Sequence, residues 1–465
     1  MKDKVLLVLA FGALLHVIYV DSLIDRDAGF FMVVGQGIAE GGVLYRDFFD
    51  FKPPGMHYTS ALVYLLVRDS LLGFKVAVLM VNLASAYILY ELARILWDGK
   101  SALAASFMYL LGLPLFNGLS FLSEQFVVLF SGLGLLCYLQ HLKSGGIRHL
   151  LASGVLLGVS FLYKQVGLLV LAAVFCHYVL TSRRIGYAVS FAFFSVIPFI
   201  VFMAYFASLG LLGEALNSML SIVGRYGSSP LSEIIEYSYG NFILYPILWI
   251  LSFSSVLSLL RRKDLASDES VIHASFLISV VPTFFQQFPH YYVPALFFGC
   301  MLAGKAILDI WKASSKLKDR EAGTVITILI LLMFTPTIFK LAVEYHYITK
   351  YRMLGKFMEA SEYVKDNTLA GEKVLVVPNE PLIYFISRRD SPTKYLHLDY
   401  SSYYPGIEER IIGEAEGESV RFFVVRESVY LDEYAGVIHD YILGNCVLVK
   451  SVDDKYPIKV YRRVK

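Results

Sequence analysis

Long apolar runs, separated by short polar connections, occupy most of the chain before residue 344. They lie at 5–20, 74–97, 101–118, 121–142, 148–163, 165–181, 186–207, 241–260, 270–287, 290–309 and 323–343. At a rise of about 1.5 Å per residue, each run is roughly long enough for a helix that crosses a hydrocarbon core of about 30 Å. The pattern therefore predicts a polytopic α-helical membrane protein with about eleven transmembrane helices.

The first apolar run follows Met1-Lys2-Asp3-Lys4, a basic start that is typical of a secretory signal. No cleavage site with small residues follows the run, because residues 20–23 read Val-Asp-Ser-Leu. We therefore expect an uncleaved first transmembrane helix.

Basic residues fall in every second connection between the apolar runs. They are Lys2 and Lys4, Lys100, Lys143 and Arg148, Arg183 and Arg184, Arg261, Arg262 and Lys263, and Lys312, Lys316, Lys318 and Arg320. Cytoplasmic loops of membrane proteins carry such an excess of positive charge. The alternation predicts a multi-pass protein of the cell membrane with a cytoplasmic amino terminus. It places the loops 21–73 and 208–240 and the segment 344–465 on the outer face.

The composition changes from membrane-like to globular after residue 344. An amphipathic helix is expected over 350–367, followed by β-prone runs at 373–378, 420–425, 446–452 and 458–464. These features predict a transmembrane domain over 1–344 and an extracytoplasmic α/β domain over 345–465.

The overall composition agrees with a membrane protein. Hydrophobic residues make up 57% of the chain, charged residues 17%, and mean hydropathy is +0.59, which is too apolar for a soluble enzyme. A net charge of +2 indicates no nucleic-acid partner. The four Cys and ten His show neither a disulfide framework nor metal-ligand spacing. No cofactor is indicated, and a divalent metal is left open.

Charged residues gather in the first predicted outer loop. Between residues 25 and 55 lie five acids and three bases, namely Asp25, Asp27, Glu40, Asp47 and Asp50 with Arg26, Arg46 and Lys52. Ionisable groups are expensive at membrane depth and usually serve a function there. We therefore expect the active site in loop 21–73.

The order of motifs in this loop resembles that of a known superfamily. Asp25-Arg26-Asp27-Ala28-Gly29, Tyr45-Arg46-Asp47 and Asp50-Phe51-Lys52-Pro53-Pro54-Gly55 resemble the first outer loop of the protein O-mannosyltransferase and aminoarabinose transferase superfamily, polytopic glycosyltransferases of the GT-C fold. Weaker similarities continue at Ser123-Glu124, at Tyr163-Lys164-Gln165 and at Phe288-Pro289-His290-Tyr291-Tyr292.

This resemblance implies an inverting glycosyltransferase with a polyprenyl-phosphate sugar as donor, either dolichyl or undecaprenyl, and a lipid, glycan or protein acceptor outside the cytoplasm. Such a transfer needs a carboxylate to accept the acceptor's proton and a cation to stabilise the departing phosphate. Asp27 matches the catalytic aspartate of the superfamily, and Lys52 matches the lysine of its Lys-Pro-Pro motif. The superfamily commonly has Glu directly after the aspartate, where this chain has Ala28, and Asp25 is the nearby acid that could compensate.

Further residues are candidates of the same site. Lys164, Arg225, His290 and Tyr291 are expected to contact the donor phosphate, and Arg46, Asp50 and Glu124 are additional candidates.

Several of these residues also have structural interpretations. Asp27 could be the N-cap of a helix that begins near Ala28, and Asp25 could form a local ion pair with Arg26. Asp47 and Asp50 could form turns or pair with Arg46 and Lys52. Lys52 could extend to lipid headgroups, while His290 and Tyr291 could belong to an interfacial aromatic belt.

Two other classes of function stay open. A secondary transporter would carry ionisable residues or broken helices near the midplane of several spans, whereas these spans are largely uncharged. A non-catalytic membrane subunit with a partner-binding outer domain is the second alternative, and Ala28 is its best argument.

Overall fold

The computed structural model describes residues 2–182, 184–220, 231–285, 288–314, 320–398, 404–428, 431–453 and 456–464. In the membrane part its helices are α1 Lys2–Ile18, α2 Arg26–Ala39, α3 Gly55–Val67, α4 Leu71–Leu96, α5 Gly99–Gly112, η1 Leu113–Phe116, α6 Ser123–Ser144, α7 Ile147–Tyr163, α8 Gly167–Thr181, α9 Ile185–Ser208, α10 Leu212–Leu220, α11 Leu231–Leu244, α12 Pro246–Arg262, α13 Ser270–Val280, η2 Val281–Phe284, η3 Pro289–Tyr292, α14 Val293–Ser314 and α15 Arg320–Tyr351. After them come α16 Met353–Asn367, β1 Val374–Val377, α17 Leu382–Ser387, α18 Ile407–Gly417, β2 Phe422–Arg426, α19 Leu431–Asn445, β3 Cys446–Val452 and β4 Ile458–Arg463.

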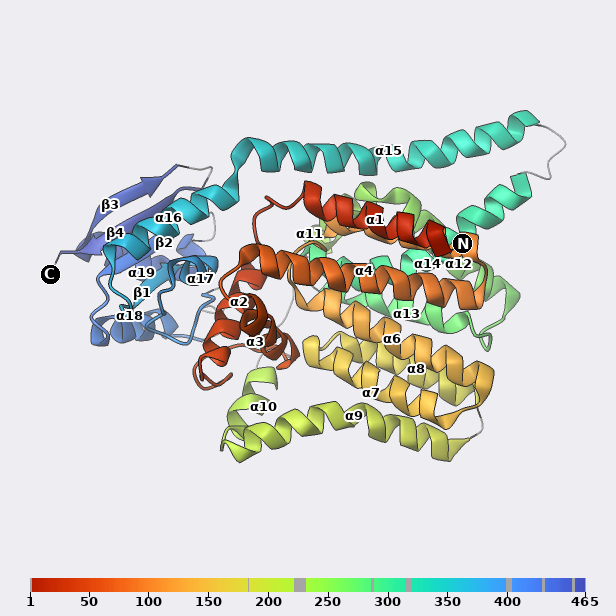
Figure 1. Cartoon of the computed structure of the whole chain (residues 1–465), viewed down its shortest axis with the longest axis horizontal. Helices are drawn as coiled ribbons and strands as arrows, with labels where there is room; N and C mark the ends of the chain where they lie inside the picture. Colours follow the sequence, from red (N-terminus) through yellow and green to blue (C-terminus); the bar gives the residue numbers. More distant parts are fainter. Residues whose placement is uncertain are drawn as a thin grey trace.

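Every apolar run predicted to span the membrane contains a helix. Within the described residues, six helices are long and apolar enough to cross a membrane, or up to seven if α11 and α12, which meet at 102°, form one broken span. Shorter apolar helices include α3, α7 and α8. Figure 1 shows α1, α4, α6, α7 and α9 running along the long axis of the molecule. The prediction of a polytopic helical bundle is confirmed.

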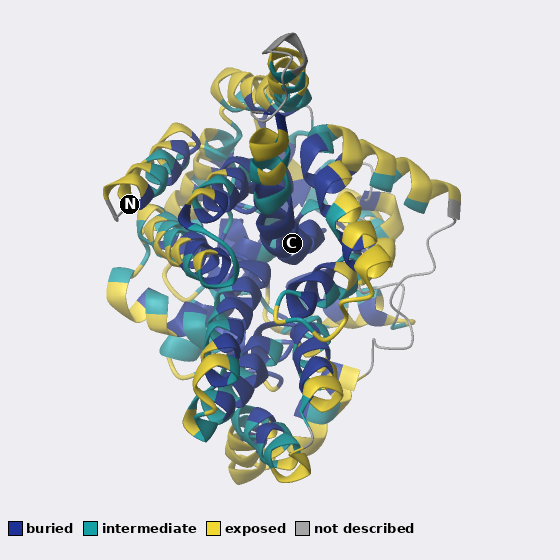
Figure 2. Cartoon of the chain, turned by 90° about the vertical axis from the view of Figure 1, so that its right-hand side faces the viewer, coloured by how far each residue is buried: buried dark blue, intermediate teal, exposed yellow. Residues whose placement is uncertain are grey.

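The bundle has a buried centre and an apolar periphery. All residues from Val293 to Gly304 of α14 are buried, and the view along the bundle in Figure 2 shows buried residues inside and exposed residues outside. Large apolar side chains such as Phe193 and Phe339 are exposed on the outer helices. A lipid-facing surface has this character, because hydrocarbon does not penalise exposed apolar groups.

The predicted outer loop 208–240 contains helices. Its described residues include α10 and most of α11, and its position on the outer face stays a prediction. Three apolar side chains of α10, Ala215, Leu216 and Met219, pack into the cluster that also holds α2 and the C-terminal sheet. Burial of this apolar face stabilises a helix where length alone suggested a connection.

The C-terminal segment, residues 345–465, contains a four-stranded sheet in the order β1-β2-β4-β3. Strands β1 and β2 are parallel, and the other neighbours are antiparallel. Three of the strands lie within the runs predicted from the sequence, and β2 ends one residue beyond the run 420–425. Alternate residues of β1 point to opposite faces, with Val374 and Val376 on the side of α16 and Leu375 and Val377 on the side of α18 and α19.

The C-terminal segment packs directly on loop 21–73. A Cβ on Gly29 of α2 would lie 3.0 Å from the backbone nitrogen of Leu382, and the Phe49 N–H donates to the Lys394 carbonyl at 3.0 Å. One apolar cluster includes Phe30 and Phe31 of α2 together with Phe385 of α17. The division into domains over 1–344 and 345–465 stays a prediction.

At the opposite end of the bundle, the connections that were predicted to be cytoplasmic contact one another. Lys312 Nζ lies 2.9 Å from Asp98 Oδ2, Trp97 Nε1 donates to Glu269 at 2.8 Å, and Lys143 donates to the Ile95 carbonyl. The predicted outer and inner connections are thus grouped at two separate ends. Which end faces the cytoplasm stays a prediction.

Candidate active site

The start of α2 holds the two acids that the sequence assigned to catalysis, one at the N-cap and one in the first turn. Asp25 is the N-cap, and its Oδ1 accepts a hydrogen bond from the Asp27 N–H at 3.0 Å. Its Oδ2 accepts from Asn117 Nδ2 at 3.2 Å. The helix begins at Arg26 rather than near Ala28, so the proposal that Asp27 caps it was wrong. The Asp27 carboxylate is therefore available for contacts outside the helix.

Lys52 meets that carboxylate. Its Nζ lies 3.1 Å from Asp27 Oδ2, and the Lys52 side chain is 4% exposed. The ammonium group also lies 5.1 Å from the ring centroids of Phe31 and Phe51. A lysine held in this way does not extend to lipid headgroups, which corrects the structural interpretation of Lys52.

The charge state of Asp27 follows from its neighbours. Burial opposes ionisation, but the positive charge of Lys52 and the electrostatic effect of His397, His290 and Lys164 outweigh it, so that the pKa of Asp27 is held below its usual range. At Asp25 the balance is reversed, because burial raises the pKa of its carboxyl. The two acids, although separated by one residue, differ in their readiness to lose a proton.

Asp50 supports the loop that carries Lys52. Its side chain is 1% exposed, its Oδ1 accepts from the Phe51 N–H at 2.7 Å, and its Oδ2 accepts from His57 Nε2 at 2.8 Å. Burial opposes ionisation of Asp50, but the charge of Lys52 and the hydrogen bond from His57 keep the pKa below its usual value. His57, in the first turn of α3, was not among the predicted site residues, because no pattern in the sequence marks it.

A second buried ion pair lies next to Asp27. Lys164 ends α7 and forms an ion pair with Glu124 of α6. Its ammonium group is 3.5 Å from the centroid of the Tyr291 ring, and His290 Nε2 is 3.8 Å from Glu124 Oε1. Four of the residues predicted for the site therefore form one group at the ends of α6 and α7 and in η3.

A cavity of about 540 Å³ joins these groups. The membrane part contributes Leu23, Ile24, Asp25, Arg26, Asp27, Lys52, Asn117, Ser120, Phe288, Pro289, His290 and Tyr291. The C-terminal segment contributes Asn379, His397, Arg426 and Tyr434. The cavity is thus bounded by the bundle on one side and by the sheet on the other.

Ion pairs connect the C-terminal side of the cavity to α2. Glu380 forms an ion pair with the buried Arg426 of β2 and lies 3.5 Å from Arg26 Nε. Burial raises the pKa of Glu380 despite both guanidinium groups. Arg26 thus meets Glu380, whereas the sequence analysis suggested a local pair with Asp25. No signal in the sequence linked residues 380 and 426 to a loop more than 300 positions earlier.

Two further candidates lie away from the cavity. Arg46 is exposed and pairs with Asp47, Nη2 to Oδ2, at 2.8 Å, as its structural interpretation predicted. Arg225 lies outside the described residues. Within the part of the chain that the structure covers, no group of three or more His, Cys, Asp or Glu side chains is placed to hold a metal ion.

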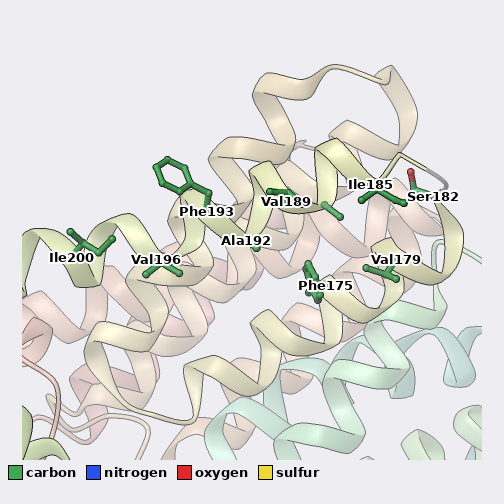
Figure 3. A pocket seen from close by; sticks show the side chains of 10 residues that line it. Phe175, Val179, Ser182, Ile185, Val189, Ala192, Phe193, Val196 and Ile200 are labelled. Atoms are coloured by element: carbon green, nitrogen blue, oxygen red, sulfur yellow. The ribbon is translucent and has the colours of Figure 1, made fainter.

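A larger cavity has a different character. It measures about 690 Å³ and lies between α8 and α9, where Figure 3 shows it lined mainly by apolar side chains: Phe175, Val179, Ser182, Ile185, Ala188, Val189, Ala192, Phe193, Val196 and Ile200. Such a lining offers no acid, base or cation to a reaction. The polar cavity at Asp27 is therefore the candidate active site.

Comparisons with known proteins agree with this fold. Residues 51–207 match the family model described as dolichyl-phosphate-mannose-protein mannosyltransferase. A comparison with curated proteins found no match. The chain is similar in structure to ArnT from Cupriavidus metallidurans bound to undecaprenyl phosphate, with a TM-score of 0.65, 13% identity and coverage of 99% of this chain and 98% of that one.

It is also similar to the oligosaccharyltransferase from Archaeoglobus fulgidus tethered with an acceptor peptide, with a TM-score of 0.59, 13% identity and coverage of 100% of this chain and 74% of that one. The archaeal oligosaccharyltransferase AglB from the same organism, in complex with an inhibitory peptide and a dolichol-phosphate, gives a TM-score of 0.59 at 12% identity, with the same coverage of 100% and 74%. At these identities the likeness shows the fold.

The class is thus a polytopic membrane protein with the GT-C fold and a small C-terminal sheet. The match over residues 51–207 and the shared GT-C fold agree with the resemblance of the first-loop motifs.

Proposed function

We propose that this protein transfers a sugar from a polyprenyl-phosphate donor to an acceptor in the cavity at Asp27, on the outer face of the membrane. The observation that carries this proposal is the contact between Asp27 and Lys52 at the wall of a polar cavity. The matched family segment begins at residue 51 and includes Lys52. The similar ArnT structure contains undecaprenyl phosphate, and the similar AglB structure contains a dolichol-phosphate.

The transfer can be written with these two side chains. The acceptor hydroxyl gives its proton to Asp27 while its oxygen bonds to the anomeric carbon of the sugar. The bond from that carbon to the phosphate oxygen breaks, and its electron pair stays on the phosphate, whose charge the Lys52 ammonium stabilises. Attack from the face opposite the phosphate inverts the anomeric centre.

The ion pair of Asp27 and Lys52 also couples donor binding to basicity. Before the donor binds, the ammonium group of Lys52 faces the Asp27 carboxylate at 3.1 Å and favours its ionised, weakly basic form. A donor phosphate that binds the Lys52 ammonium weakens the stabilisation of the ionised Asp27 carboxylate, so the pKa of Asp27 rises towards its ordinary value. Asp27 then becomes a better base when the donor is in place.

The remaining groups receive supporting roles. Lys164 is largely neutralised by Glu124, so we assign it the placement of the Tyr291 ring and an electrostatic contribution at Asp27. His290 and Tyr291 line the cavity beside Asp27 and are assigned to the donor. Both carboxylate oxygens of Asp25 accept hydrogen bonds, Oδ1 from the Asp27 N–H as the helix N-cap and Oδ2 from Asn117. This favours a structural role for Asp25 over a role as a second catalytic acid.

Ala28 is the residue that favours the alternative of a non-catalytic subunit. It is fully buried and packs in the apolar cluster between α2 and the C-terminal segment. A Glu at this position would have to be accommodated in that apolar cluster. We infer that transfer in this chain proceeds with Asp27 as the single acid of the first turn.

The test of this function is detection of the product. Glycolipids and glycoproteins of cells with and without the protein are compared by mass spectrometry, which identifies the sugar and the acceptor together. The purified full chain is then given the matching polyprenyl-phosphate sugar. We expect release of polyprenyl phosphate and a glycosylated acceptor, and no turnover with any polyprenyl-phosphate donor would favour the non-catalytic subunit.

A further inference from the structure

The backbone of Lys52 is held on both sides by buried groups. Its N–H donates to Asp50 Oδ1 at 3.3 Å, and its carbonyl accepts from the Tyr45 hydroxyl at 2.8 Å. The preceding peptide is held as well, because the Phe51 N–H donates to the same Asp50 oxygen and its carbonyl accepts from Gln165 at 3.0 Å. Such a set of bonds determines where the Lys52 side chain begins.

Tyr45 adopts a conformation that is unusual for its residue type. Its φ is 70°, a left-handed conformation that bulky L-residues rarely adopt. The side chain is nearly fully buried, and its hydroxyl reaches the Lys52 carbonyl. A strained residue persists where its surroundings over-determine it, and such residues cluster at functional sites.

Asp50 connects this backbone to a rigid helix. Its second oxygen accepts from His57 Nε2 at 2.8 Å, and the His57 side chain is 0% exposed. The imidazole packs edge-on against Phe31, with centroids 5.4 Å apart. Helix α3, which carries His57, packs closely on α7. The contact is so close at Gly55 that an added Cβ would lie 2.6 Å from the Leu162 carbonyl oxygen.

We propose that Asp50 and His57 form a positioning pair that sets the backbone of Lys52 and thereby aims its ammonium group at Asp27 and at the donor phosphate. This inference rests on the proposed function, in which Lys52 holds that phosphate. Neither Asp50 nor His57 lines the cavity, so both act through Lys52. His57 donates from Nε2, which leaves the Asp50 carboxylate free to accept two backbone N–H groups with its other oxygen.

The loss of the His57 donor has a defined consequence. A buried carboxylate oxygen without a partner is costly, so Asp50 would turn away to find another donor. Its other oxygen would then leave the Phe51 and Lys52 N–H groups. The Lys52 ammonium would lose its fixed place opposite Asp27, while the bundle itself would keep its packing.

The test is a binding measurement on the purified full chain with undecaprenyl phosphate as the probe. His57→Leu removes the donor, and His57→Gln offers an amide N–H at a similar reach. We expect the dissociation constant to rise about ten-fold for His57→Leu, the size of one charge-assisted hydrogen bond, and to recover for His57→Gln. In a Lys52→Ala background, His57→Leu should add no further loss, because the positioned group is then gone.

Tyr45→Phe gives a second route that removes one hydroxyl and keeps the shape. It should weaken binding of the probe in the native background and leave it unchanged in the Lys52→Ala background. Equal losses in both backgrounds would overturn the positioning role, because they would mean a structural effect independent of Lys52. A loss for His57→Leu that His57→Gln does not recover would also overturn it. If Lys52→Ala itself bound the probe like the native protein, the donor role in the proposed function would fail instead.

Discussion

Arg426 of β2 and Glu380 form a buried ion pair at the border of the cavity, and Arg26 at the start of α2 meets the same carboxylate. The pair joins the C-terminal sheet to the turn that carries Asp27. Removal of one member of a buried pair leaves an uncompensated charge and typically costs about 3 to 5 kcal/mol. We therefore expect Glu380→Gln to lower the melting temperature clearly.

An exposed pair of the same segment provides the control for that prediction. Arg421 and Glu372 lie 2.7 Å apart, but the Arg421 side chain is 56% exposed, so Glu372→Gln should cost less than about 1 kcal/mol. The double variant Glu380→Gln, Arg426→Met should recover part of the loss, because it leaves no unpaired guanidinium. Equal melting temperatures for Glu380→Gln and Glu372→Gln would contradict the buried link.

Gly29 sets the distance between α2 and α17. A Cβ at Gly29 would lie 3.0 Å from the Leu382 nitrogen, whereas a Cβ at Gly413 of α18 would meet no atom within 4 Å. Gly29→Ala should therefore push the C-terminal segment away from α2 and reduce both stability and transfer. Gly413→Ala should be neutral or stabilise α18 by up to about 1 kcal/mol. Thermal unfolding and turnover of both variants check this, and a Gly29→Ala protein that matches the native one in both would refute the close contact.

The stability of the protein should depend on pH through Asp27. Lys52 and the other positive groups hold the pKa of Asp27 below its usual value, which is about 3.9 in an unfolded chain. A depressed carboxyl pKa contributes stability that is fully present above the unfolded value and is lost as pH falls through the folded value. The stability difference between the native protein and Asp27→Asn should thus be constant near neutral pH and shrink below about pH 4.

Thermal unfolding of both proteins over this pH range tests the sign. A difference that grows on acidification would mean that the protonated form of Asp27 is the one favoured by folding. The pKa of Asp50 is also held below its usual value. Asp50 is present in both proteins, so its contribution to stability cancels from the comparison.

Much of the architecture could be predicted from the sequence. Apolar runs of membrane length and β-prone runs after residue 344 depend on local composition, and both kinds of element were found where they were expected. The cluster of charges in loop 21–73 likewise pointed to the cavity, since five predicted residues, Asp25, Asp27, Lys52, His290 and Tyr291, line it.

Other features depend on tertiary contacts that no local pattern contains. Asp25 and Asp27 are equally good N-caps by residue type, so residue type could not show that Asp25 is the N-cap and that Asp27 contacts Lys52. His57, Glu380 and Arg426 were missed because each becomes significant through a partner brought near by folding. Helix α10 within the loop 208–240 was not predicted, because its apolar face is buried by contacts that only folding brings about.

The central claim is that the Asp27 carboxylate is the general base of a glycosyl transfer, and the most direct test is the turnover of Asp27→Asn. Asn keeps the shape of the side chain but cannot accept the proton, so a loss of about 10² to 10⁴ in rate is expected. Asp47→Asn is the matched control, because Asp47 lies in the same loop and outside the cavity. Assayed with the donor found by mass spectrometry, a folded Asp27→Asn protein should be nearly inactive while Asp47→Asn stays active. Near-native turnover by a folded Asp27→Asn protein would contradict the account.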